Sequence, residues 1–190
     1  MNIDVSFMFA MPVWMVDLKP DPDDVEWCQQ RRRIDPGRTV SNDGGYQSNP
    51  ITTSIPIIEK INNIAQTISN QYYQLNKETK VSNYWVNINS YNHSNGRHIH
   101  TNSFLSGVYY VQAPYNCGEI EFYRGDKEQY ILNSFECPGA GNPYTCDSVQ
   151  YVPEDGRLII FPSYQSHAVR SNLSKEERIS ISFNITHHGD

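Results

Sequence analysis

The sequence predicts an α+β fold in which helices cover one face of a β-sandwich or jelly roll. Two helical patterns occupy the first 80 residues, whereas the rest of the chain alternates short strands with turns. Helices followed by a run of strands are typical of α+β domains. The 190 residues can form one domain with its own core. We therefore expect a single domain over residues 1–190, with helical support at about 20–78 and a β core at about 80–186.

The first 80 residues predict one edge strand and two helices. Residues 5 to 18 alternate in polarity around Pro12, which favours a strand at the edge of a sheet. Asp21 and Pro22 open a helix that runs to about Arg33. A second helix is expected over residues 56–75, because apolar residues recur there at spacings of three and four. Its apolar face implies packing against a sheet.

The remaining chain predicts six strands and two loops of interest. The strands cover residues 81–91, 104–113, 119–123, 148–152, 157–161 and 179–185. Residues 41–50 are dense in turn residues and predict an ordered loop. Residues 124–147 lack clear periodicity, and loops of that length are often functional, for example as lids. We expect substrate contacts in both loops.

Composition excludes several classes of protein. The net charge of −6 and the pI near 5.5 argue against a nucleic-acid binder. No apolar run is long enough to cross a membrane, and the first residues lack the pattern of a signal peptide, so a cytoplasmic protein is expected. The four cysteines lack metal-binding spacing and should be reduced, with a bridge between Cys137 and Cys146 unsupported. The final residues, 186–190, are expected to form a frayed tail.

A pair of histidines, His98 and His100, precedes a β-rich apolar run. Residues i and i+2 of a strand point to the same side, so both imidazoles can reach one metal ion. Exposed or hydrogen-bonded histidines are the alternative interpretation. His167 opens a later strand after a turn, and in a double-stranded β-helix it would lie at the same end of the barrel as His98. Three imidazoles would then converge and leave coordination positions open, as in catalytic iron sites.

Arg178 and Ser180 stand on the same side of the last strand. A guanidinium and a hydroxyl inside an apolar barrel are costly unless they meet an anion, and a bidentate carboxylate would satisfy them. The alternative interpretation is a surface ion pair between Arg178 and Glu176 or Glu177.

A series of motifs resembles the 2-oxoglutarate/Fe(II)-dependent oxygenases, and within them the prolyl-hydroxylase-like branch of bacteria and bacteriophages. The motifs are His98-x-His100, Ser106-Gly107-Val108-Tyr109-Tyr110-Val111, Gly118-x-Ile120-x-Phe122, Pro153-x-x-Gly156 leading to Phe161-Pro162-Ser163 and His167, and Arg178-x-Ser180-x-Ser182-x-Asn184. Ser41-Asn42-x-Gly44-Gly45-Tyr46-Gln47-Ser48 and Trp85-Val86-Asn87 also match. The resemblance covers roughly residues 10 to 185, and the ordered set is more specific than any single motif.

The resemblance implies a double-stranded β-helix core and a site for Fe(II) and 2-oxoglutarate. His98 and His167 would bind the iron, and Arg178 would pair with the distal carboxylate of 2-oxoglutarate. Tyr110 and Ser180 would assist Arg178, and Asn87 and Tyr91 are weaker candidates for the same pocket. The implied reaction uses O2, hydroxylates a substrate and releases succinate and CO2, with ascorbate as an additional cofactor candidate. If the chain is encoded by a phage, the protein is expected in the cytoplasm of the infected host.

The sequence departs from the family at His100, where the superfamily usually has Asp or Glu. A third imidazole leaves the site more positive than a triad that includes a carboxylate. His100 is one candidate for the third ligand, and Glu119 or Glu121 is the other. A peptide or a small molecule remains open as the substrate, and the protein is expected to be a monomer or homodimer. A cupin-type metalloenzyme that does not use 2-oxoglutarate and a non-catalytic jelly-roll binding or virion protein are the competing functions.

Overall fold

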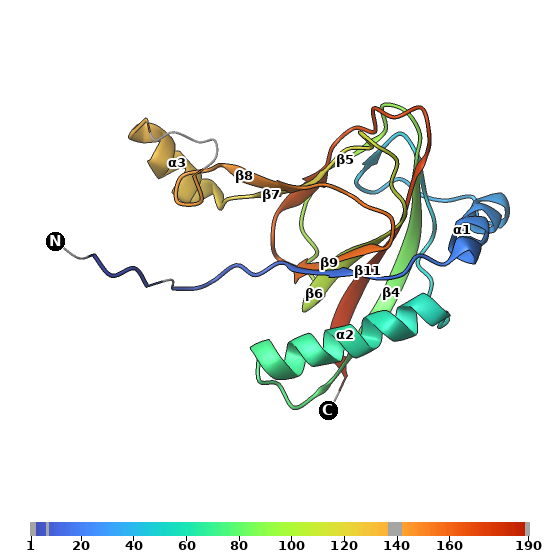
Figure 1. Ribbon diagram of the computed structural model, residues 1–190, viewed down its shortest axis with the longest axis horizontal. Coiled ribbons are helices and arrows are strands. Elements are labelled where there is room, and N and C mark those ends of the chain that lie inside the picture. The colour runs from blue at the N-terminus through green and yellow to red at the C-terminus, as the bar shows by residue number, and fades with distance from the viewer. Residues whose placement is uncertain (1–2, 7, 137–141, 189–190) are drawn as a thin grey trace.

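The computed structural model describes residues 3–6, 8–136 and 142–188. Within this part of the chain, two antiparallel sheets face each other (Figure 1). One sheet has six strands in the order β1 (Trp14–Asp17), β9 (Arg157–Pro162), β6 (Leu105–Gln112), β11 (Arg178–His188), β4 (Glu78–Asn89) and β3 (Tyr46–Gln47). The other has five, in the order β2 (Asn42–Asp43), β5 (Ser94–His98), β10 (His167–Val169), β7 (Ile120–Tyr123) and β8 (Ser148–Tyr151).

Two of the helices support the six-stranded sheet on its outer face, as the sequence predicts. Helix α1 (Pro22–Ile34) begins with Pro22 in its first turn and is capped by the Asp21 carboxylate, which accepts a hydrogen bond from the Asp23 amide. Helix α2 (Pro56–Tyr72) runs beneath β4 and β11 (Figure 1). Four of its isoleucines are buried in the larger core cluster, and the fifth, Ile64, is partly buried against it; the four are Ile57, Ile58, Ile61 and Ile68. Among the described residues, no helix has the length and apolar character that a membrane span requires.

Alternation along the strands separates an apolar outer face from a more polar inner face. On β11, Ile179, Ile181, Phe183 and Ile185 face the helices, whereas the residues between them face the other sheet. The sequence analysis placed Arg178 and Ser180 among these isoleucines, but the residues that share their side are Ser182 and Asn184. The space between the sheets therefore combines a small apolar cluster around Val108, Ile120, Phe122 and Phe161 with hydroxyls and amides.

Several expected elements differ from the structure. The first strand is shorter than predicted and begins at Trp14, two residues after Pro12; it does lie at the edge of its sheet. Strand β5 includes His98, which was expected in a strand, but it begins earlier, at Ser94, in a stretch for which no strand was expected. Strand β11 continues to His188, so the predicted frayed tail is wrong up to that residue. The His187 imidazole lies 3.0 Å from the Thr79 hydroxyl, which holds the end of the strand against β4.

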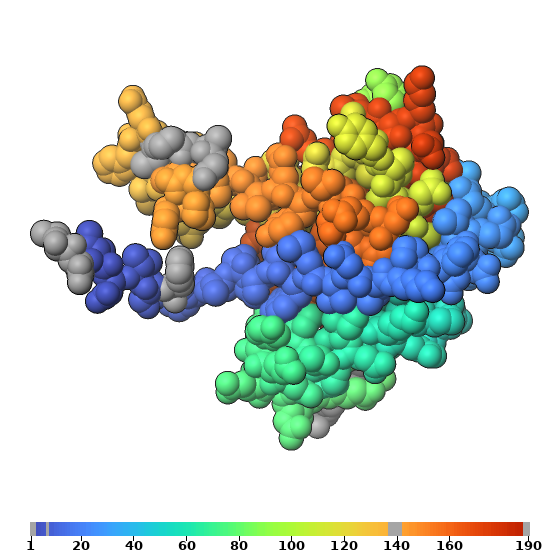
Figure 2. Space-filling view, in the orientation of Figure 1, coloured from blue at the N-terminus to red at the C-terminus, as the bar shows by residue number. Residues whose placement is uncertain are grey.

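The segment over residues 124–147 is not a plain loop. It begins as helix α3 (Asp126–Ser134), which projects with β7 and β8 away from the body of the molecule (Figures 1 and 2). The extended N-terminal arm projects on the same side. Cys28 and Cys117 are buried free thiols, and Cys146 is also free. Cys137, Gly189 and Asp190 lie outside the described residues, as does the beginning of the chain at Met1 and Asn2.

Candidate metal and 2-oxoglutarate site

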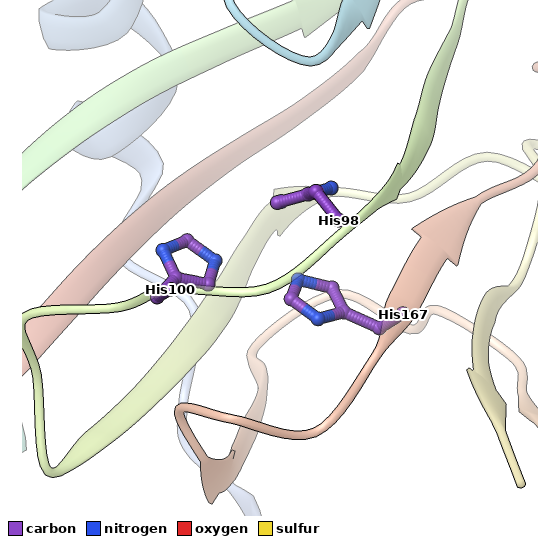
Figure 3. Close-up of side chains that lie close together, drawn as sticks. All are labelled: His98, His100 and His167. Atoms are coloured by element: carbon purple, nitrogen blue, oxygen red, sulfur yellow. The ribbon is translucent and has the colours of Figure 1, made fainter. Parts of the chain in front are cut away.

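Three histidines converge between the sheets, at one end of the five-stranded sheet. His98 is the last residue of β5, His100 follows two residues later, and His167 opens β10. Each offers a ring nitrogen, and these three atoms lie within 4.8 Å of one another. The rings face a common space (Figure 3). Both imidazoles reach this space, but only His98 is within β5, so the expected strand alternation does not account for the direction of His100.

The backbone fixes which nitrogen of two of the rings faces this space. The Nδ1 atoms of His98 and His167 lie 2.7 Å and 2.9 Å from the carbonyl oxygens of Gly96 and Gln165. A carbonyl can only accept a hydrogen bond, so each Nδ1 carries the proton and each Nε2 keeps a free lone pair. That tautomer is the one a metal-binding imidazole requires when its Nε2 is the ligand.

His100 is held by its backbone and by stacking. Its amide donates to the Ser163 carbonyl at 2.9 Å. The ring packs between Trp85, at 5.9 Å between ring centroids, and His167, at 5.2 Å with the two planes only 7° apart. This packing explains why the side chain turns inward after the end of β5.

The environment keeps the imidazoles neutral. Burial, followed by the nearby His98, lowers the pKa of His100 to about 4. Burial and His98 also lower the pKa of His167 to about 3, and burial lowers the pKa of His98. Neutral imidazoles are the form that binds metal ions. The three side chains are thus in the correct protonation state near neutral pH.

The carboxylates that competed with His100 in the sequence analysis lie elsewhere. Glu121 is on the side of β7 opposite to Ile120 and Phe122, where it accepts hydrogen bonds from Ser148, Gln150 and Tyr123. Glu119 does not line the cavity next to the histidines. Among the described residues, the only group of three or more His, Cys, Asp or Glu side chains that could hold a metal is His98, His100 and His167.

A cavity leads from the histidines to Arg178 on the six-stranded sheet. Arg178 is 1% exposed, and its Nη1 donates to the carbonyl oxygens of Cys117, Gly118 and Arg170. Its Nη2 is buried and has no hydrogen-bond partner among the residues that the structure describes. The surface ion pair with Glu176 or Glu177 is therefore absent; the Glu177 carboxylate instead accepts from Arg32 and Gln29. Burial lowers the pKa of Arg178, which nonetheless stays a cation at any physiological pH.

Two further residues predicted from the sequence, Ser180 and Tyr110, lie near Arg178. Ser180 lines the same cavity, and Tyr110 stands opposite Ser180 in the β6–β11 pairing. The Tyr110 hydroxyl is also buried without a partner, and burial raises the pKa of this phenol, so it remains a hydrogen-bond donor. Tyr110 is not among the residues that line the cavity, but its phenol is close enough to Arg178 for the two groups to affect each other's charge. The hydroxyl and Arg178 Nη2, which have no hydrogen-bond partner among the described residues, are costly to bury unless a ligand accepts from them. A carboxylate oxygen is the acceptor that fits a guanidinium best.

Of the two weaker candidates for the 2-oxoglutarate pocket, Asn87 lines the cavity and Tyr91 does not. Asn87 lines the cavity, donates to the Ser182 hydroxyl at 2.9 Å and leaves its Oδ1 without a partner. Tyr91 does not line the cavity, because it lies in the turn after β4 with its side chain 64% exposed. We therefore exclude Tyr91 from the site.

The sequence analysis missed several residues of the cavity wall. Trp85, Asn89, Asn95 and Ser182 line it, as does Ser41 from the loop before β2. Spacing by two along the strands would have found most of them, since Trp85 and Asn89 flank Asn87, and Ser182 follows Ser180. Asn95 and Ser41 carried no such signal.

A second, open groove of ≈ 610 Å³ begins at His98 on the outer side of the histidines. Its walls come from the N-terminal arm at Met11, the β9–β10 turn at Tyr164, and the start of α3 at Asp126. Arg97 joins these parts: it donates to Ser166 and to the Asp126 carboxylate, both at 2.7 Å, and lies 4.5 Å from the centre of the Tyr123 ring.

Several solved structures have the same fold as this chain. A Pseudomonas putida prolyl-4-hydroxylase superposes with a TM-score of 0.66 at 13% identity, covering 94% of each chain. The collagen prolyl hydroxylase of Paramecium Bursaria Chlorella virus-1, in complex with 2-oxoglutarate, gives 0.57 at 14% identity over 91% of this chain and 94% of that one. HygX from Streptomyces hygroscopicus, with nickel, 2-oxoglutarate and hygromycin B bound, gives 0.60 at 8% identity over 93% and 83%.

Sequence comparison gives the family. A search among curated protein sequences found no significant match. The model of the family described as 2OG-Fe(II) oxygenase, 2OG-FeII_Oxy_5, matches residues 83–184, which is more than half of the chain. The matched segment contains the three histidines, Arg178 and the strands that hold them. The chain belongs to the 2OG-Fe(II) oxygenase family and is an oxygenase with a double-stranded β-helix core.

Proposed function

We propose that this oxygenase hydroxylates a peptide or small-molecule substrate with consumption of 2-oxoglutarate and O2 and release of succinate and CO2. His98, His100 and His167 hold Fe(II), and Arg178, Ser180, Tyr110 and Asn87 form the pocket for 2-oxoglutarate. The proposal rests on one cavity that contains both a group of possible metal ligands and a buried cation. Three imidazole nitrogens lie within 4.8 Å of one another, and a buried guanidinium with an unpaired Nη2 lines the same cavity.

In this proposal, side chains and backbone carbonyls of the cavity bind and orient the metal and 2-oxoglutarate. The carbonyls of Gly96 and Gln165 fix the rings of His98 and His167 so that their Nε2 atoms face the metal position. Arg178 Nη2 and the Tyr110 hydroxyl offer donors to the far carboxylate of 2-oxoglutarate. Bound there, the metal and 2-oxoglutarate supply the oxidative chemistry. The apolar cluster of Val108, Ile120, Phe122 and Phe161 limits access of water to this side of the cavity.

The substrate approaches through the groove that begins at His98. The groove lies outside the cavity that contains Arg178 but shares His98 with it, so a substrate there lies next to the metal position. Among the structures with the same fold, one is a collagen prolyl hydroxylase and another was solved with hygromycin B. This range supports both substrate classes. Residues of the 41–50 and 124–147 segments, among them Ser41 and Asp126, lie where substrate contacts are expected.

Anaerobic titration tests the proposal directly. Protein loaded with Fe(II) should develop a metal-to-ligand charge-transfer band when 2-oxoglutarate is added, and exposure to O2 with a suitable substrate should yield succinate, with or without ascorbate. Arg178→Gln should weaken 2-oxoglutarate binding while it leaves the affinity for Fe(II) nearly unchanged. Arg33→Gln is the matched control, because that guanidinium is exposed and pairs only with Glu26.

The competing functions predict different results. A cupin-type enzyme without 2-oxoglutarate would bind Fe(II) but show no charge-transfer band, and it would give Arg178 no role. A non-catalytic binding or virion protein would not bind Fe(II) tightly. Equal loss of metal and 2-oxoglutarate in Arg178→Gln would mean that Arg178 has only a structural role.

A further inference from the structure

We propose that two copies of this chain form a dimer by exchanging their N-terminal arms, residues 3–12, across the free edge of β1. Residues 3–6 of each arm pair as an antiparallel strand with β1 of the other copy, and their apolar side chains enter a groove between β1 and α2. The inference is independent of the proposed function, because neither the arm nor this groove contains a proposed ligand of the metal or of 2-oxoglutarate.

The N-terminal arm continues from β1 and extends away from the body of the molecule (Figures 1 and 2). Its described residues, 3–6 and 8–12, belong to no helix or strand. Five apolar side chains on it are half or more exposed: those of Ile3, Val5, Met8, Phe9 and Met11. Phe9 is 96% exposed and has a φ of 55°, which is an unfavourable backbone conformation for an aromatic residue. The arm therefore gains little from its own chain.

The arm nevertheless has the sequence of a strand. Ile3 and Val5 alternate with Asp4 and Ser6, so the two apolar side chains fall on one side of an extended chain. A segment with one apolar side is stabilised when a surface covers that side. Both apolar side chains are exposed in the single chain, so the covering surface belongs to another molecule.

The outer edge of β1 is open to an added strand. Among the described strands, β1 is the first of the six-stranded sheet and pairs only with β9. The Leu18 amide donates to the Gly156 carbonyl at 2.9 Å. Every second residue of an antiparallel strand bonds to the same neighbour, so Val16 and Trp14 direct their backbone groups to β9, and Met15 directs its own outward. No lysine or proline protects β1 itself, which is how proteins usually guard such an edge.

Pro12 does not block this edge. It has the same alternation as Trp14 and Val16, so its missing N–H removes a bond to β9 and not a bond to an added strand. This explains why β1 begins only after Pro12, at Trp14. The outward edge of the preceding residues stays available.

A groove lies beside the free edge, between β1 and α2. It has a volume of ≈ 530 Å³, and its walls include Trp14 and Val16 from β1 and Ile64 and Ile68 from α2. These four side chains pack on the larger core cluster and give the groove an apolar floor. Apolar side chains of an added strand would extend this core.

One register places the apolar side of the arm over the groove. When Val5 of one copy lies opposite Trp14 of the other, Ile3 follows on the same side, because directly opposed residues share a side of the sheet. The intervening Asp4 then lies opposite Met15, whose outward N–H and C=O can bond to the backbone of the arm.

A second copy fits this surface because the pairing is self-complementary. The register in which residue 5 meets residue 14 also makes residue 14 meet residue 5, so a single two-fold axis satisfies both arms. The axis passes between Phe9 and Ala10, and Met8 of each copy lies opposite Met11 of the other. With five exposed apolar side chains from each copy, the buried area is on the order of 1,500 Å², within the range of about 1,200–2,000 Å² for a stable interface.

Sedimentation velocity on the intact chain tests the proposal. The wild-type protein should form a dimer with a dissociation constant in the micromolar range or below, as interfaces of this size do. A protein that remains monomeric at its highest soluble concentration overturns the proposal, whatever else covers the edge of β1.

Two substitutions in the arm separate the apolar contact from a general effect of charge. Val5→Asp places a carboxylate in the groove and should weaken the dimer at least about tenfold. Ser6→Asp adds the same charge on the other side of the arm and should change the affinity by no more than about twofold. Both residues are exposed in the single chain, so neither change disturbs the monomer. Equal weakening by both variants overturns the proposal, and so does a lack of effect of Val5→Asp.

Two substitutions at Met15 test the edge. Met15→Pro removes the outward N–H and should yield monomers, whereas Met15→Ala keeps this N–H and should remain dimeric. Far-UV circular dichroism checks that both variants fold. Unchanged dimer affinity in Met15→Pro overturns the proposal; if this variant does not fold, the Val5 and Ser6 variants decide.

Cross-linking tests the register. Asp4→Cys protein is mixed with Met15→Cys protein and oxidised, and a disulfide should join the two different chains, because directly opposed residues have Cα atoms about 5.5 Å apart. Ser6→Cys mixed with Met15→Cys is the control, since that pair is offset by two residues, and each variant alone reports any bond made by the native cysteines. Absence of the first disulfide, or equal yield in the control, overturns the proposal. None of these measurements uses a metal or 2-oxoglutarate, so their failure leaves the proposed function untouched.

Discussion

His98 and His167 lie directly opposite each other in the antiparallel pair formed by β5 and β10, with ring centroids 4.3 Å apart. A cross-strand pair is among the most rigid ways to hold two side chains together, because the backbone hydrogen bonds of the ladder fix both. Two of the three proposed metal ligands are thus held together by the five-stranded sheet itself.

Removal of each histidine should weaken metal binding in proportion to its role. Mutation of outer-shell partners usually costs about 10–100-fold in metal affinity, so loss of a ligand should cost more than about 100-fold. We expect this for His98→Ala, His100→Ala and His167→Ala in Co(II) titrations. His93→Ala is the control, since this imidazole accepts a hydrogen bond from the Ser90 amide and is not part of the cluster. Unchanged affinity in His100→Ala would remove His100 from the ligand set.

Tyr110→Phe should separate stability from cosubstrate binding. The Tyr110 hydroxyl is buried without a partner, so its removal should leave the melting temperature of the apoprotein unchanged or raise it. The same change should weaken 2-oxoglutarate binding about tenfold if the hydroxyl donates to the ligand. Tyr109→Phe, on the opposite side of β6, serves as the control. A lower melting temperature together with unchanged 2-oxoglutarate affinity would contradict the assigned role.

The apoprotein should lose stability as the pH falls below about 6.5. The pKa values of His100 and His167 are lowered to about 4 and about 3 in the folded state. Between these values and the ordinary histidine pKa, the unfolded chain binds protons that the folded chain does not, and unfolding is favoured. Chemical denaturation at several pH values should show this slope. A smaller slope is expected for His167→Gln, and an identical slope would be inconsistent with a neutral buried His167.

Arg97→Gln should loosen α3 without disturbing the sheets. Arg97 connects Ser166, Asp126 and the Tyr123 ring at the base of α3. Partly exposed ion pairs contribute roughly 0.2–1 kcal/mol, so amide hydrogen exchange over residues 126–134 should rise by only a few-fold. Exchange in β4 and β11 should not change. Asp126→Asn should reproduce part of the effect, and a rise across all strands would instead mean global destabilisation.

The sequence predicted the elements whose signal is local. Helix α2 and most long strands follow from spacing along the chain, and the cap at Asp21 marks the start of α1. The first residues of strand β5 were missed because Asn92 to Gly96 has the composition of a turn, and pairing with β2 and β10 decides their conformation instead. Helix α3 was missed because none of its residues is buried, so it has no apolar stripe to recognise.

Prediction of the site was strongest where a strand fixes the direction of a side chain. Arg178 and Ser180 follow from alternation along β11, and His98 is the last residue of β5. His100 lies beyond the end of β5, so its position depends on its contacts with Ser163, Trp85 and His167 and not on alternation. Tyr91 was misplaced because it lies two residues beyond the end of β4, in a turn where that alternation no longer applies. Ser41 and Asn95 depend on the pairing of β2 with β5, which no local pattern reveals.

The metal position and the guanidinium belong to different layers of the molecule: His98 and His167 are on the five-stranded sheet, and Arg178 is on the six-stranded one. A molecule that binds the ion at one end and Arg178 at the other therefore connects the two layers. The two layers then cannot separate unless such a molecule dissociates. If 2-oxoglutarate binds as proposed, it should make the two sheets unfold together, although no described strand of one sheet is paired with a strand of the other.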